Sequence, residues 1–399
     1  MFRIPLVTAL ALLAVGAQQK QVFRSDVDVI AIDVAVIDGK GTPVPSLGPD
    51  DFDVTVSGKP RKVVRAAWMA YGAPAAAPGA AAPAATPGSA ATPVDESAME
   101  SSNRMFVIAI DQESLEQTGA YAARNAVEGF IDRLRPDDRI GIYTFPARLA
   151  NFTLTTDHAM LKRSLFNLAG VRQQPINQYH MTIPEIIDIA NGDTDAEARV
   201  FARECAGGTN CSSSSIRTES NSLATNLELE MTKSIEGLRG LMHGLAEIPG
   251  RKILVLVSGG MISSDMHGGR VNAANEIRTL VSDAAAANAA LFVLHLDWSY
   301  QQTFGKKDDT SGTYFRNGEI SKTGLELMAG MLGGDLIRVQ GNSGDVAFTR
   351  ILNETSAYYL LGVEPIPEDR DGKTHPIKVK VKRRNVTVLA RSEVTIPLK

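Results

Sequence analysis

The sequence predicts an α/β protein in which a doubly wound, mostly parallel sheet is inserted into, or appended to, a small β-sandwich. Two patterns carry this prediction. From Arg104 onward, short continuous apolar runs alternate with segments of helical periodicity, which is typical of parallel strands covered by helices on both faces. Near the two ends of the chain, apolar and polar residues alternate with period two, which indicates antiparallel strands with one buried face.

The first segment, residues 1–17, is expected to be a cleaved signal peptide. Arg3 precedes an apolar run, IPLVTALALLAV, and small or compact residues stand at the cleavage position before Gln18. This run is too short to span a bilayer, which needs about twenty residues. We therefore expect a periplasmic or secreted protein with no membrane span in its mature chain.

Residues 18–71 are expected to form the first part of the β-sandwich. Strand-like alternation covers residues 27–38, a hairpin turn follows at Asp38-Gly39, and residues 51–69 supply two more short strands. A unit this short is marginal by itself. Because strand alternation returns over residues 354–399, we expect these terminal strands to complete the same sandwich.

Residues 72–102 are predicted to be an Ala/Pro-rich linker. They consist largely of Ala, Pro, Gly, Ser and Thr, so they have few large side chains to bury and cannot offset the entropy of ordering. The linker therefore marks a domain boundary.

Residues 103–353 are predicted to form the α/β domain, with an insertion at 171–222 and an aromatic, polar loop at 298–319. This loop either anchors a protein partner or packs onto the adjacent helix. The apolar runs predict strands over residues 104–111, 139–145, 151–155, 252–260, 290–297 and 335–340. The helical periodicity predicts helices over residues 119–134, 157–168, 223–248, 272–288 and 321–332.

The composition excludes several classes of function. Lys and Arg number 41 against 45 Asp and Glu, a balance without the basic excess that a nucleic-acid-binding protein needs. The two cysteines are too few for a thiolate zinc site. The six histidines include no His-Glu-x-x-His pair, and the chain has no Gly-x-Ser-x-Gly motif, so no hydrolase signature is present.

Cys205 and Cys211 lie in a polar, glycine-containing stretch of the insertion. After export they are free to oxidise, and the stretch offers no apolar burial for a thiol. We expect a disulfide between them, with two buried free thiols as the alternative.

Four stretches, in this order, resemble the von Willebrand factor type A domain, and more closely the exported type A-related proteins of Acidobacteria: residues 32–63, 152–168, 238–261 and 356–365. The resemblance covers nearly the whole mature chain. It implies a type A-like sheet with a divalent cation at its C-terminal edge, where ligands of open α/β sheets collect.

The resemblance also places the expected cation site, a degenerate form of the metal-ion-dependent adhesion site. The usual Asp-x-Ser-x-Ser loop corresponds to Asp111, Glu113 and Leu115, and the usual Thr-Asp-Gly loop has Gly259 in place of its aspartate. The resemblance leaves Asp111 and Glu113 as ligands for Mg²⁺, Ca²⁺ or Mn²⁺, with Asp265 as a third.

Two readings of this loop stay open: a reshaped cation site, and a vestigial one in which Asp111 caps the next helix. A threonine ligand would come from Thr218 or Thr225. If the backbone is that of the family, restoring Ser at Glu113 and Leu115 and Asp at Gly259 is expected to raise Mg²⁺ affinity.

The resemblance implies an exported, non-enzymatic protein-binding or adhesion module that uses the C-terminal edge of the sheet. Its partner would be a protein or a surface polymer. The alternative is an extracytoplasmic metal-dependent hydrolase with Asp111 and Glu113 around the metal. The lack of a nucleophile paired with a base favours the binding module.

Overall fold

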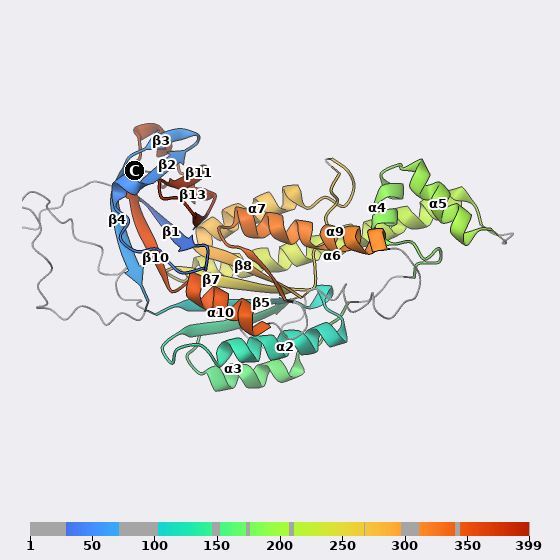
Figure 1. Ribbon diagram of the computed structural model, residues 1–399, viewed down its shortest axis with the longest axis horizontal. Helices are drawn as coiled ribbons and strands as arrows, with labels where there is room; N and C mark the ends of the chain where they lie inside the picture. Colours follow the sequence, from blue (N-terminus) through green and yellow to red (C-terminus); the bar gives the residue numbers. More distant parts are fainter. Residues whose placement is uncertain are drawn as a thin grey trace, which may run out of the picture.

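The structure, a computed structural model, describes residues 29–71, 103–145, 152–172, 176–206, 211–266, 268–296, 311–339 and 344–398. The expected signal peptide, the linker at 72–102 and most of the aromatic loop at 298–319 lie outside these residues. A β-sandwich, a central α/β body and a projecting group of helices follow one another along the long axis (Figure 1).

The strands have the following bounds: β1 (Ile30–Asp38), β2 (Phe52–Val56), β3 (Lys59–Arg61), β4 (Val63–Ala70), β5 (Met105–Asp111), β6 (Arg139–Phe145), β7 (Lys252–Ser258), β8 (Ala289–Leu296), β9 (Leu336–Val339), β10 (Ala357–Val363), β11 (Thr374–Val381), β12 (Val386–Ala390) and β13 (Glu393–Thr395). The α-helices have the following bounds: α2 (Gln117–Ile131), α3 (His158–Ser164), α4 (Ile183–Ala190), α5 (Thr194–Glu204), α6 (Ser213–Ala246), α7 (Ala274–Ala287), α9 (Ser311–Met331) and α10 (Gly344–Glu354). The short 3-10 helix η2 (Gln112–Ser114) follows β5, and η3 (Leu165–Asn167) follows α3.

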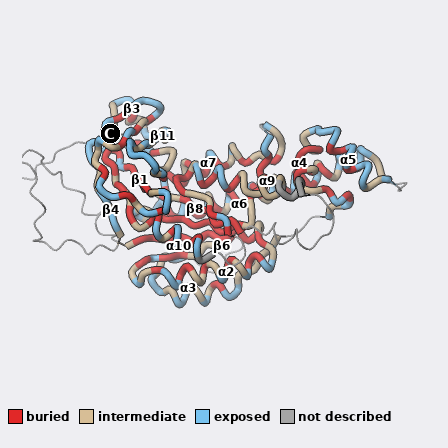
Figure 2. The backbone as a smooth tube through the Cα atoms, viewed as in Figure 1, coloured by how far each residue is buried: buried red, intermediate tan, exposed pale blue. Residues whose placement is uncertain are grey.

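The central sheet has the strand order β6-β5-β7-β8-β9, and every neighbouring pair is parallel. Every residue of β5 and β7 is buried, as the continuous apolar runs predict. One face packs on α2, α3 and α10, and the other packs on α6, α7 and α9. Figure 2 shows the buried strands between the two helical layers. The predicted doubly wound α/β class is confirmed.

The β-sandwich is built from both ends of the described chain. One sheet has the order β12-β1-β10-β4 and the other has the order β13-β11-β2-β3. β1 pairs with β10 and β12, and β2 pairs with β11, so each sheet joins early strands to late ones. A buried ion pair also joins the ends, since the Arg61 guanidinium donates two bonds of 2.7 Å to Asp369. The exact domain boundaries stay a prediction.

Several elements differ from the sequence prediction. α6 begins at Ser213 rather than 223, α9 begins at Ser311 rather than 321, and α10 was not predicted. The described part of the strand expected at 151–155 makes one antiparallel bridge, between Thr155 and Ile140. The early start of α6 has a tertiary cause: its polar first turns bury Ile216 and Ser220, and the Ser220 hydroxyl donates to the Ile186 carbonyl of α4 at 2.7 Å.

Within the described ranges, no helix combines the length and apolar character that crossing a bilayer requires.

Candidate functional site

The candidate site lies at the carboxyl edge of the parallel sheet, where β5 and β7 end side by side. β5 leads to β6 on one side and neighbours β7 on the other, so this is the point at which the strand order reverses. Ligand sites of open α/β sheets form at this position. The loops after the two strands touch, because the Gly259 amide donates to the Ser114 hydroxyl at 2.8 Å.

Asp111 ends β5 and is 1% exposed. Its Oδ2 accepts a hydrogen bond from Ser234 of α6 at 2.9 Å and a longer one from Ser258 at 3.5 Å. Its Oδ1 is buried and has no hydrogen-bond partner among the described residues. Burial raises the pKa of Asp111 to about 6, although the Ser234 hydrogen bond opposes that rise. The ionised Asp111 carboxylate therefore lowers the stability of the fold, and it is not an exposed helix cap.

Glu113 lies in η2, and only one of its two carboxylate oxygens accepts a hydrogen bond from the described residues. Lys233 of α6 donates from its ammonium group to Oε1 at 3.1 Å. Oε2 is buried and has no hydrogen-bond partner in the described part of the chain. Lys233 thus supplies part of the positive charge that a bound cation would supply.

Asp265 does not join the other two predicted ligands, which is a correction to the expected ligand set. It lies 3.4 Å from the guanidinium of Arg316, which forms two shorter bonds to Asp188. Across the described ranges, no three or more His, Cys, Asp and Glu side chains are grouped so that they could hold a metal ion.

The two departures from the type A motif have structural causes. Leu115 is 1% exposed and packs into the apolar core between the sheet and α2. A Cβ atom at Gly259 would lie 2.3 Å from the Ser114 carbonyl oxygen, a distance that real Cβ atoms do not show. The expected gain in Mg²⁺ affinity depends on the backbone being that of the family; at Gly259 this backbone leaves no room for a Cβ atom, so we expect no such gain from an aspartate there.

The expected threonine ligands also lie elsewhere. The hydroxyls of Thr218 and Thr225 donate to carbonyls one turn earlier in α6. Ser234 is the α6 hydroxyl that reaches Asp111. The residues at this edge therefore do not fit the divalent cation that the resemblance implies.

A small hollow, here called the edge hollow, opens beside Glu113 and encloses about 350 Å³ including its open mouth. Its apolar lining consists of buried side chains: Leu227, Met231, Met261 and Ile262. Its polar and charged lining consists of Glu113, Ser114, Arg172, Glu230 and Ser234.

Glu230 is the second carboxylate of the edge hollow, and the described residues offer it no hydrogen bond or ion pair. Burial raises its pKa, and the charge of Glu113 raises it further, while Arg172 opposes the rise. Sequence reasoning did not find Glu230, Ser234 or Arg172. The one available signal was the spacing of Glu230 and Ser234, which puts both on one face of a helix.

A helical unit, defined as α4, α5 and the first half of α6, projects beyond this edge (Figure 1). Its apolar core also takes in Ile262 and Val271 from the segment after β7 and Ile320 from α9. Because these residues belong to the α/β body, the unit is packed firmly against the edge that carries the hollow.

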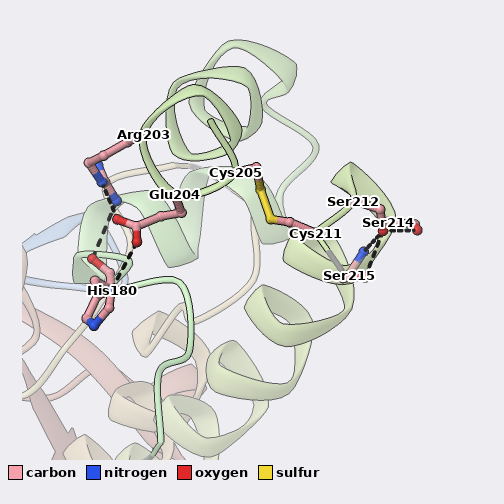
Figure 3. The surroundings of a disulfide bond; sticks show 8 residues. All are labelled: His180, Arg203, Glu204, Cys205, Cys211, Ser212, Ser214 and Ser215. Atoms are coloured by element: carbon pink, nitrogen blue, oxygen red, sulfur yellow. Dashed lines mark hydrogen bonds and ion pairs between the residues drawn. A yellow bond between two sulfur atoms is a disulfide. The ribbon is translucent and has the colours of Figure 1, made fainter. Parts of the chain in front are cut away.

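The predicted disulfide between Cys205 and Cys211 is confirmed, with Cα atoms 5.5 Å apart. It joins the end of α5 to the start of α6 (Figure 3). Beside it, Glu204 accepts hydrogen bonds from Arg203 at 2.8 Å and pairs with His180 at 3.0 Å. The tip of the helical unit is therefore fixed by a covalent link and an ion-pair network.

No protein-family model and no curated protein matches the chain. Among solved structures, the chain is similar to one described as the crystal structure of the SpRpn10 VWA (von Willebrand factor type A) domain. The TM-score is 0.26 and the sequence identity is 11%, over 60% of this chain and 88% of that one.

Proposed function

We propose that the chain is an exported, non-enzymatic module that binds a partner protein with the carboxyl edge of its parallel sheet. The observation that carries this proposal is an exposed aromatic stack beside that edge. Tyr121 of α2 and Phe166 of η3 are 60% and 77% exposed. The Arg124 guanidinium lies between them, 5.1 Å and 5.9 Å from the two ring centroids.

This stack is tied to the loop that follows β5. The segment after Phe166 returns to that loop, where the Val171 amide donates to the Gln112 carbonyl at 3.0 Å and the Arg172 amide donates to the Leu115 carbonyl at 3.1 Å. Aromatic residues and arginine are the types that dominate the binding energy of protein interfaces. The aromatic stack, the edge hollow and the helical unit thus offer a binding surface on pre-ordered elements, which limits the entropy lost on binding.

The test is affinity capture with the full-length chain, using the exported proteins of its own host as prey. We expect Phe166→Ser to weaken capture of the partner by tenfold or more, a loss of about 1.4 kcal/mol. The matched control is Val64→Ser, which changes a 38% exposed apolar residue on β4 of the sandwich. Equal capture by Phe166→Ser and the control would contradict the proposal.

A further inference from the structure

We propose that the edge hollow binds a basic side chain, lysine or arginine, of the partner protein. This proposal rests on the proposed function and names what the partner inserts at the site. Two independent observations support it: the lining of the hollow joins an apolar wall to two carboxylates, Glu113 and Glu230, and the carboxylate of Asp111 beside the hollow is buried with one oxygen unpaired among the described residues.

The apolar half of the hollow matches the carbon chain of a basic residue. Leu227 and Met231 come from one face of α6, and Met261 and Ile262 come from the segment after β7; none is more than 8% exposed. Lysine and arginine bury their methylene groups along apolar surface while the charged end seeks a polar partner. Thioether side chains adapt readily to such a chain.

On the polar side of the hollow, two carboxylates match the cationic end; the other polar residues there are Ser114, Ser234 and Arg172. Glu113 keeps its buried Oε2 unpaired because Lys233 bonds to Oε1 alone. Glu230 lines the same hollow one turn before Ser234, and its charge lies close enough to Glu113 for each to feel the other. A cation between them would pair with the free Oε2 of Glu113 and with Glu230.

Asp111 provides the second, independent observation. It is 99% buried behind Ser234, which donates to its carboxylate, and Ser114, which donates to its main-chain carbonyl; both serines line the hollow. Its Oδ1 is buried and unpaired within the described residues. A buried unpaired oxygen is rare in proteins because its desolvation is uncompensated, so a positive charge in the adjacent hollow is favoured.

The charges of this region do not cancel. Three carboxylates, Asp111, Glu113 and Glu230, face two cationic side chains, Arg172 and Lys233, which leaves one negative charge in excess. One partner ammonium or guanidinium group balances that excess. A divalent cation is a poorer match, since half of the lining is apolar and Mg²⁺ or Ca²⁺ requires a shell of oxygens.

The experiment titrates the full-length chain with n-butylammonium, which is the end of a lysine side chain, and with n-butanol, which has the same carbon chain without the charge. The readout is NMR of ¹³C-labelled methionine methyl groups, because Met231 and Met261 both line the hollow. Their signals are assigned with Met231→Leu and Met261→Leu. We expect saturable shifts of both signals, with n-butylammonium bound about tenfold more tightly than n-butanol.

Two variants separate the carboxylates of the hollow from general surface charge. Glu230→Gln is expected to weaken n-butylammonium binding about tenfold. The control is Glu236→Gln. Glu236 lies on the same helix, is 63% exposed and pairs with Arg239, so this variant should leave n-butylammonium binding unchanged. Glu113→Gln is a second variant in case Glu230→Gln alters the packing of α6.

The outcomes are distinct. Equal binding of n-butylammonium and n-butanol would overturn the proposal. Unchanged n-butylammonium binding by both Glu230→Gln and Glu113→Gln would also overturn it. Shifts of the same methyl groups with Mg²⁺ alone, at lower concentration than n-butylammonium, would overturn it in favour of a metal site. If partner capture depends on Phe166 but not on Glu230, the proposed function stands and this inference fails.

Discussion

Asp111→Asn is expected to stabilise the protein at neutral pH, because the native carboxylate is ionised in a buried place. Asp111 is 1% exposed, and burial raises its pKa from 3.8 to about 6. This rise corresponds to about 3 kcal/mol by which folding disfavours the ionised form. The substitution removes the charge and keeps the shape, and its amide oxygen still accepts from Ser234. We therefore expect a gain approaching ~3 kcal/mol at pH 7.

The pH dependence fixes the sign of this effect. Well below pH 3.8 the carboxyl group is protonated in both the folded and the unfolded chain, so the two proteins should be about equally stable there. Between the unfolded pKa of 3.8 and the folded pKa of about 6, the unfolded chain binds fewer protons, so the wild-type free energy of unfolding falls as pH rises. Well above pH 6 the penalty is complete and constant.

The assay is urea unfolding of both proteins at pH 4 and pH 7.5, followed by circular dichroism, with the difference read from the transition midpoints. Asp132→Asn is the control, since it removes an exposed carboxylate paired with Lys162 and should change stability by less than ~1 kcal/mol at either pH. If Asp111→Asn is less stable than wild type at pH 7.5, the carboxylate contributes to the fold through a partner and the reasoning is refuted.

Four further predictions concern other parts of the chain. Arg61→Met leaves Asp369 buried without its ion-pair partner and should lower the free energy of unfolding by ~3–5 kcal/mol, measured by thermal melts. Adding Asp369→Leu to this variant should recover most of the loss in the same measurement. Cys205→Ser opens the disulfide and should cost ~2–3 kcal/mol, seen as faster amide exchange in α5 with no change in β5. Gly259→Asp should destabilise the chain without creating Mg²⁺ affinity, and calorimetry showing tight Mg²⁺ binding would contradict our account of the two loops. Mass spectrometry of exported protein should find an N-terminus at Gln18, and an intact first methionine would contradict export by cleavage.

The parts of the fold that could be predicted from sequence are those in which one pattern has one structural reading. Continuous apolar runs such as 105–110 and 253–257 are short enough for strands and apolar enough to need cover on both faces, so they predict a parallel sheet. The serine-rich start of α6 has only weak apolar periodicity, so its local sequence does not favour a helix over a loop. It is helical because Ile216 and Ser220 pack on α4, a contact that local sequence does not encode.

The residues of the candidate site also divide into those that the sequence pattern predicts and those that tertiary contacts place. Asp111 was found because it ends a buried strand within a motif. Glu230 and Ser234 lie more than a hundred residues later, on a helix whose rotation against β5 depends on packing of the whole layer. Arg172 comes from a connecting segment whose path follows its backbone bond to Leu115. These positions depend on tertiary contacts, so spacing along the chain could not place them.

If the edge binds a partner as we propose, its carboxylates would contact that partner without a metal ion between them. In a site that recruits a partner through a metal ion, the ion is electrophilic and the protein's own carboxylates are engaged by it. Here Leu115 fills core space, Gly259 lets the two loops touch, and Lys233 holds one oxygen of Glu113. With those contacts in place, the oxygens left unpaired are acceptors only, so under our proposal a partner at this edge brings the positive charge itself. The edge would then repel an acidic partner residue, which is the opposite of the preference that a metal would create.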